Sequence, residues 1–105
     1  MYRATTPTHT FTLPIDTSTC KEILVTYKQG RTKLDKHYQD STLPSGMTLD
    51  GANVIIKLTQ AETLMFSHNH SVYAQVRVLT VDDSAYASQR FKISINDVLN
   101  EDILQ

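Results

Sequence analysis

Four histidines and a single cysteine are the side chains best suited to metal binding or nucleophilic chemistry. His68 and His70 stand two residues apart in "SHNHS", and on a strand that spacing points both rings the same way, as a chelating pair requires. A zinc site needs three or four ligands, and the neighbouring Asn69 and serines are poor ligands for zinc. The pattern therefore favours an exposed loop, and a metal site or cryptic enzyme centred on His68 and His70 is the alternative.

The remaining reactive side chains do not form a recognisable catalytic set. Cys20 would need a histidine beside it in a cleft, but it sits in a Thr/Ser-rich loop before a strand, which is typical of a small, half-buried hydrophobe. Asp82 and Asp83 are adjacent in a predicted turn, where their side chains point apart into water and a raised pKa is not expected. The three glycines are not clustered to wrap a phosphate. We expect no catalytic residue, no cofactor and no enzyme activity.

Composition predicts one soluble globular domain spanning residues 1–105. The formal net charge of −1 provides no overall basic field, so we expect no nucleic-acid partner. The run Lys28–Lys36, "KQGRTKLDK", is basic, but around a hairpin tip it favours a solvated strand face. No apolar stretch approaches the roughly 20 residues of a membrane span, so we expect no membrane partner. The opening residues do not resemble a signal peptide, which predicts synthesis in the cytoplasm.

Alternating apolar and polar residues predict strands along most of the chain. The pattern appears in "THTFTLP", "KEILVTYKQG", "RTKLDKHY" and "ANVIIKLT", with a short strand at Met47–Leu49. The side chains predicted to face the core in these runs are Phe11, Leu13, Ile23, Val25, Tyr27, Leu34, Tyr38, Val54, Ile56 and Leu58. Gly30 is placed to turn the second run into the third, which predicts a hairpin.

Thr59 and Glu62 have the spacing of a helix capping box, but the following run is too short for more than one helical turn. Further on, "VYAQVRVLTVDDSAYASQRFKISI" alternates, turns at "DDSA" and alternates again, which predicts two long paired strands. Their inward faces would carry Val72, Ala74, Val76 and Val78, and Phe91, Ile93 and Ile95.

The strand count and spacing predict an all-β fold. We expect an immunoglobulin-like antiparallel β-sandwich of six to eight strands with one short helical turn near residues 59–65. A small closed barrel is the structural alternative. Residues 1–6 and 97–105 are expected to form extended or interface-forming tails, the second of them as a helical turn or an acidic extension.

Several pieces taken together resemble a known group of proteins. These are "TPTHTFTLP", "EILVTYKQG", "LTQAETLMF", "AQVRVLT" and "SINDVLNEDIL". In this order they resemble short proteins encoded among the tail genes of phages and prophages of Gram-positive bacteria. More remotely they resemble the N-terminal β-sandwich module of phage upper-baseplate proteins. The resemblance runs from Thr6 to Leu104, although "VDDSA" lacks the glycine expected in that hairpin turn.

The resemblance implies a non-catalytic structural protein of a phage tail or baseplate, made in the host cytoplasm and carried in the virion if the prophage is functional. Its partners would be other tail or baseplate proteins or further copies of itself. The apolar side chains expected to make the contacts are Val98, Leu99, Ile103 and Leu104. Lys33 and Lys36 would discourage unwanted strand pairing at a sheet edge.

A different class of function is the alternative to this reading. Tyr73 and Tyr86 could stack on a sugar while neighbouring polar side chains form hydrogen bonds to it, which would make the chain a carbohydrate- or ligand-binding β-sandwich module.

Overall fold

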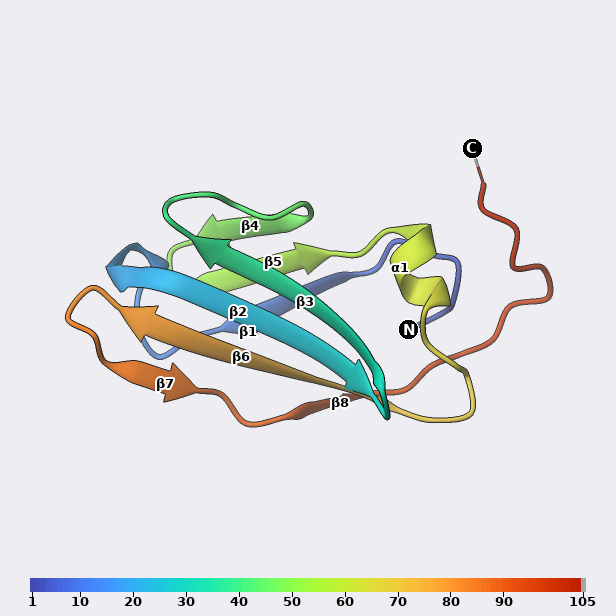
Figure 1. Ribbon diagram of the computed structural model, residues 1–105. Coiled ribbons are helices and arrows are strands. Elements are labelled where there is room, and N and C mark those ends of the chain that lie inside the picture. Colours follow the sequence, from blue (N-terminus) through green and yellow to red (C-terminus); the bar gives the residue numbers. More distant parts are fainter. Residues whose placement is uncertain (105) are drawn as a thin grey trace.

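A computed structural model describes residues 1–104, so Gln105, the last residue of the predicted C-terminal tail, lies outside the described residues. Figure 1 shows two antiparallel sheets packed face to face. The strands are β1 (Thr8–Thr12), β2 (Cys20–Gln29), β3 (Thr32–Gln39), β4 (Met47–Asp50), β5 (Asn53–Lys57), β6 (Val72–Thr80), β7 (Ala85–Ala87) and β8 (Phe91–Ile93). The predicted all-β antiparallel sandwich of six to eight strands is confirmed.

The two sheets differ in size. The small sheet has the order β1-β5-β4. The large sheet has the order β3-β2-β6-β7, and β8 pairs with β6 farther along the same edge. β2 and β6 form the long centre of the large sheet, with Val25 opposite Val76.

The core lies between the sheets and is built from the inward half of each alternating run. The fully buried side chains include Ile23, Val25, Tyr27, Val54, Ile56, Leu58, Val72 and Ala74. All of these were predicted from the period-two pattern, since one face of each strand must leave water. Each fully buried aliphatic side chain contributes about 1.5–3 kcal/mol of burial free energy, which explains why this pattern determines the fold.

The short helix α1 (Gln60–Leu64) carries the chain from the small sheet to the large one. Its capping box is formed as predicted: the Thr59 hydroxyl accepts a hydrogen bond from the Glu62 backbone, and the Glu62 carboxylate accepts one from the Thr59 backbone. Phe66, just after the helix, is fully buried and fixes the start of the following loop.

The prediction of a second long strand after the "DDSA" turn is wrong. The returning chain forms β7 and β8 instead, two three-residue strands separated by an irregular stretch. Ser88 marks the interruption, because its hydroxyl accepts a hydrogen bond from the Val76 backbone at 3.0 Å while its own N–H donates to the Val76 carbonyl. A side-chain oxygen has thus taken the place of one backbone acceptor in the ladder.

The segment before β2 was predicted as a loop but contains a one-turn 3-10 helix, Thr17–Thr19. Asp16 caps it, because its carboxylate accepts a hydrogen bond from the Ser18 backbone at 2.9 Å. That bond lowers the pKa of Asp16. Cys20, expected in the loop, is the buried first residue of β2.

Candidate interaction surface

The C-terminal segment, residues 97–104, carries three exposed large apolar side chains close together in the sequence. It contains no helix or strand, and Figure 1 shows it running outward at the end of the sandwich where α1 lies. Leu99 is fully exposed, and Leu104 and Ile103 are 77% and 51% exposed. Val98 is half-buried. Burying such side chains is favourable, so this segment is a candidate surface for association.

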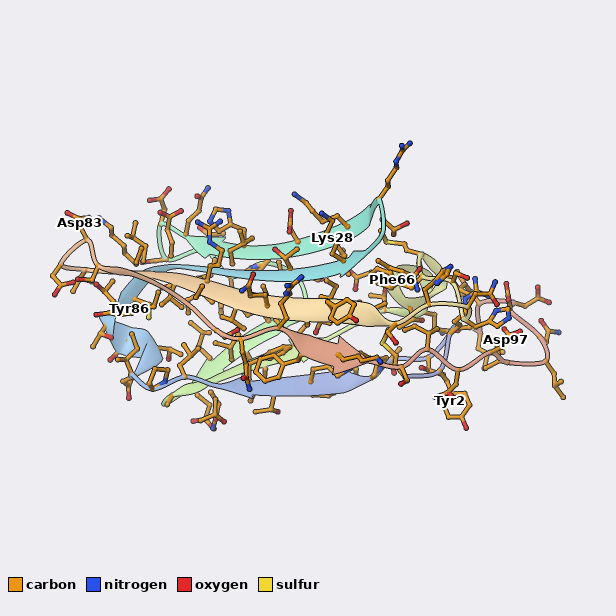
Figure 2. The ribbon with its side chains drawn as sticks, turned by 90° about the horizontal axis from the view of Figure 1, so that it is seen from below. Tyr2, Lys28, Phe66, Asp83, Tyr86 and Asp97 are labelled. Carbon is orange, nitrogen blue, oxygen red and sulfur yellow. The ribbon has the colours of Figure 1, made fainter. Side chains whose placement is uncertain are left out.

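The first residues of the chain fix the base of this segment. The amino group of Met1 donates a hydrogen bond to the Ser94 carbonyl at 2.7 Å, and the Asn96 N–H donates to the Met1 carbonyl at 2.7 Å. Tyr2 and Asn96 form a parallel bridge. Figure 2 shows Tyr2 and Asp97 at the same end of the molecule as Phe66, with Asp83 at the opposite end. The two predicted tails therefore meet at one end of the sandwich.

Arg3 connects this segment to the domain. Its guanidinium pairs with Asp97 at 3.6 Å and with Glu101, and it also donates a hydrogen bond to the Leu64 carbonyl at 3.2 Å. The Arg3 side chain is only 15% exposed, so these contacts are partly shielded from water. An arginine suits this position because its planar fork can serve several acceptors at once.

Gln60 holds the far end of the segment. Its amide nitrogen donates to the Leu104 carbonyl at 2.9 Å, and its amide oxygen accepts from the Leu104 N–H at 2.7 Å. Ile103 lines a shallow groove with Gly46, Leu58 and other residues at the junction of β5 and α1. The segment is thus tethered at both ends, while the side chains of Leu99 and Leu104 face water.

Lys36 does not lie where the sequence reading placed it. It was expected as an exposed edge cation, but it points inward from β3 and its side chain is only 8% exposed, forming an ion pair with Glu62 of α1. Burial alone would raise the pKa of Glu62, but the hydrogen bonds from Lys36 and Thr59 outweigh it and lower the pKa. Lys33 is exposed on the edge strand as expected, so the basic run is a solvated face only in part.

The histidines are dispersed. His68 lies 3.7 Å from a carboxylate oxygen of Asp97, His70 is exposed, and His37 contacts Glu22 at 3.0 Å. Residues 1–104 contain no group of three or more His, Cys, Asp or Glu side chains placed to hold a metal ion.

His9 is the histidine most involved in packing. It shares a 2.8 Å hydrogen bond with the buried Tyr27 hydroxyl, and its ring centroid lies 5.6 Å from that of Tyr27. Burial, together with the nearby amino terminus, lowers the pKa of His9, and burial raises the pKa of Tyr27. Both groups are therefore neutral near pH 7, and their hydrogen bond joins β1 to β2 across the core.

The two adjacent aspartates point to different partners, as predicted for turn residues. Asp82 accepts hydrogen bonds from Thr80 and Ser84, which lower its pKa, and Asp83 pairs with Lys21. Asp83 also takes the position for which a glycine was expected: its φ is +66°, a left-handed conformation that Asp tolerates better than most residues.

Tyr73 and Tyr86 are both exposed, but the structure does not bring them together. Tyr73 alternates with the buried Val72 and Ala74, so it lies on the outer face of the large sheet. Tyr86 pairs with Val78, whose side chain points inward, so the two tyrosines leave opposite faces. A platform that uses both rings on one sugar is therefore not present.

Sequence reasoning missed Arg3 and Gln60, the residues that tether the C-terminal segment. Arg3 belongs to no quoted motif, and Gln60 lies in "LTQAETLMF" but is not one of its two capping residues. Their partners lie 98 and 44 residues away along the chain. The inward position of Lys36 did have a signal, because it shares the period-two face of Leu34 and Tyr38.

Comparisons of the chain with protein-family models, with curated proteins and with solved structures returned no match. None of the helices within residues 1–104 has the length and apolar character required to cross a lipid bilayer.

Proposed function

We propose that this chain is a non-catalytic assembly module of a phage or prophage tail or baseplate, which associates with copies of itself or with other tail proteins through its C-terminal segment. The proposal combines the sequence resemblance with one structural observation: Leu99, Ile103 and Leu104 are exposed on a segment tethered at both ends. Synthesis in the host cytoplasm and a place in the virion belong to the same proposal.

The proposed mechanism is recognition by shape and apolar burial. A tethered segment loses less conformational entropy on binding than a free tail, because Arg3 and Gln60 already restrict it. Burying the exposed side chains of Leu99, Ile103 and Leu104 would contribute about 1.5–3 kcal/mol for each fully covered side chain. A complete interface buries roughly 800 Å² per partner, so neighbouring parts of this end of the sandwich would contribute as well.

Size-exclusion chromatography with light scattering tests self-association directly. The wild-type chain is expected to form oligomers, and the variant Leu99→Ser/Ile103→Ser/Leu104→Ser is expected to be monomeric, because it removes the exposed apolar groups without touching the core. Val81→Ser removes an exposed apolar side chain in the turn that also holds Asp83, at the opposite end of the sandwich (Figure 2), and is expected to associate like wild type.

A wild-type chain that stays monomeric up to about 1 mM, where an association of about 4 kcal/mol is half complete, would remove self-association from the proposal. Retention on purified tail particles, with the same loss in the triple variant, would then be the remaining support for docking. Failure of both would overturn the assembly function.

A further inference from the structure

The outer face of the large sheet, turned away from the small sheet, carries one unusual cross-strand row. The register places Lys33 opposite Lys28, Lys28 opposite Tyr73, and Tyr73 opposite Lys92, across β3, β2, β6 and β8. Side chains directly opposite one another point to the same face, so three amines and one phenol ring form a line. With strands about 4.8 Å apart, this line spans about 14 Å.

The cations of this row are not explained by folding. Within residues 1–104, Lys28 and Lys92 form no ion pair, nor does the neighbouring Arg90. Lys33 is compensated by Asp35 at 3.3 Å, and Asp35 also accepts a hydrogen bond from Thr26. Like charges placed directly opposite each other destabilise a sheet, so Lys28 and Lys33 lower the stability of the fold, and the contacts of Lys28 within the described residues do not offset this cost.

Tyr73 stands between two shallow hollows. Its side chain is 44% exposed, and it lines both hollows together with Gly30. One hollow is further lined by Thr26, Lys28, Gln75 and Arg90, and the other by Gln29, His70, Ser71 and Lys92. Each hollow thus combines at least one cationic side chain with hydrogen-bonding groups beside the same aromatic ring. Figure 2 shows Lys28 well separated from Tyr86 along the sheet.

We propose that this row, the Tyr73 patch, binds an acidic polysaccharide, a chain of sugar rings that carry carboxylates. The apolar face of one ring would stack on Tyr73, and carboxylates on either side would pair with Lys28 and Arg90 in one hollow and with Lys92 in the other. The spacing of the strands is comparable with the length of one sugar ring, so successive rings would meet successive side chains of the row.

The observations favour a sugar over a single-stranded nucleic acid. Nucleic-acid grooves combine a strongly basic track with several stacking rings, whereas this patch has one exposed aromatic ring in a chain of formal net charge −1. The two hollows of the patch are lined by no residue of the C-terminal segment (97–104), so this proposal does not depend on the assembly function.

Isothermal titration calorimetry of the full chain with a defined oligogalacturonate tests the proposal. Binding is expected at low salt and should weaken as salt is raised, because the pairs are exposed. Lys28→Gln/Lys92→Gln and Tyr73→Ala are each expected to weaken binding about tenfold. The matched controls Lys57→Gln, an exposed cation on the small sheet, and Tyr86→Ala, an exposed ring on the other face, are expected to bind like wild type.

Two further ligands, maltohexaose and oligo(dT), distinguish an acidic polysaccharide from a neutral sugar and from a nucleic acid. Maltohexaose, which is neutral, is expected to bind far more weakly than the acidic chain. No binding of oligogalacturonate, or equal binding by Lys28→Gln/Lys92→Gln and wild type, would overturn the proposal. Tyr73-dependent binding of oligo(dT) without binding of oligogalacturonate would also overturn it, in favour of nucleic acid. The Leu99→Ser/Ile103→Ser/Leu104→Ser variant should bind the sugar normally, so failure of the assembly function would be recognised separately.

Discussion

At the scale of single residues, the ion pair between Lys36 and Glu62 is a shielded contact between two opposite charges. The pair joins the edge strand β3 to α1, and the two side chains are only 8% and 18% exposed. Its carboxylate also closes the capping box at Thr59. Lys36 was expected to discourage unwanted strand pairing at a sheet edge. An inward-facing charge on an edge strand also opposes such pairing, so this role is compatible with the inward direction of Lys36.

Removing one partner of this pair should be costly, since the other charge would be left shielded from water. Lys36→Ala is expected to lower the free energy of unfolding by about 3 kcal/mol in urea denaturation. Lys33→Ala, on the same strand but exposed, should change it by less than about 0.5 kcal/mol. The double variant Lys36→Met/Glu62→Gln should recover most of the loss, because the glutamine oxygen still accepts from Thr59 and no charge is stranded.

The ion pair between Lys36 and Glu62 should also make the free energy of unfolding depend on pH in the acidic range. The folded-state pKa of Glu62 is below its ordinary value of 4.5, so its stabilising effect is complete above that pH and is lost as the pH falls through the folded-state value. Below pH 4.5 the free energy of unfolding of wild type should therefore fall relative to that of Lys36→Met/Glu62→Gln. A constant difference between the two down to pH 2 would contradict this role.

At the scale of elements, the strands could be predicted where alternation alone determines burial. The inward faces of β2, β5 and β6 follow directly from their sequences. The segment after "DDSA" has the same alternation but is interrupted at Ser88, because a hydroxyl bonded to the Val76 backbone replaces a ladder partner. Serine favours turns only weakly, so its residue type alone does not predict this interruption.

Gly46 allows the hairpin of β4 and β5 to form, and the sequence indicates only part of its role. Its φ is +83°, and a Cβ atom there would collide with the Lys57 carbonyl oxygen, whereas a Cβ at Gly51, whose φ is +59°, would meet open space. Gly51→Ala should therefore cost about 1–2 kcal/mol from backbone strain alone. Gly46→Ala should cost at least 1 kcal/mol more, because β4 must also shift away from β5.

Thermal or urea unfolding of the two alanine variants measures this difference. Equal stability of Gly46→Ala and Gly51→Ala would show that the approach of Gly46 to Lys57 does not constrain the hairpin of β4 and β5.

At the scale of the whole molecule, the layered fold could be predicted but the candidate surface only in part. The apolar residues of the C-terminal segment were expected to make contacts; Leu99, Ile103 and Leu104 are exposed, and their contacts stay a prediction. The tethers could not be predicted, because contacts of Arg3 with Glu101 and of Gln60 with Leu104 depend on how the finished sandwich brings distant residues together. The Tyr73 patch likewise requires the register of four strands, which no local pattern specifies.

Hydrogen–deuterium exchange at low and high protein concentration tests the central claim most directly, since it locates the surface that association covers. We expect slower exchange in residues 97–104 and at the adjoining end of the sandwich at high concentration, with unchanged exchange in the 80–84 turn at the other end. Unchanged exchange in residues 97–104 at concentrations where light scattering detects oligomers would contradict the claim that this segment forms the contact.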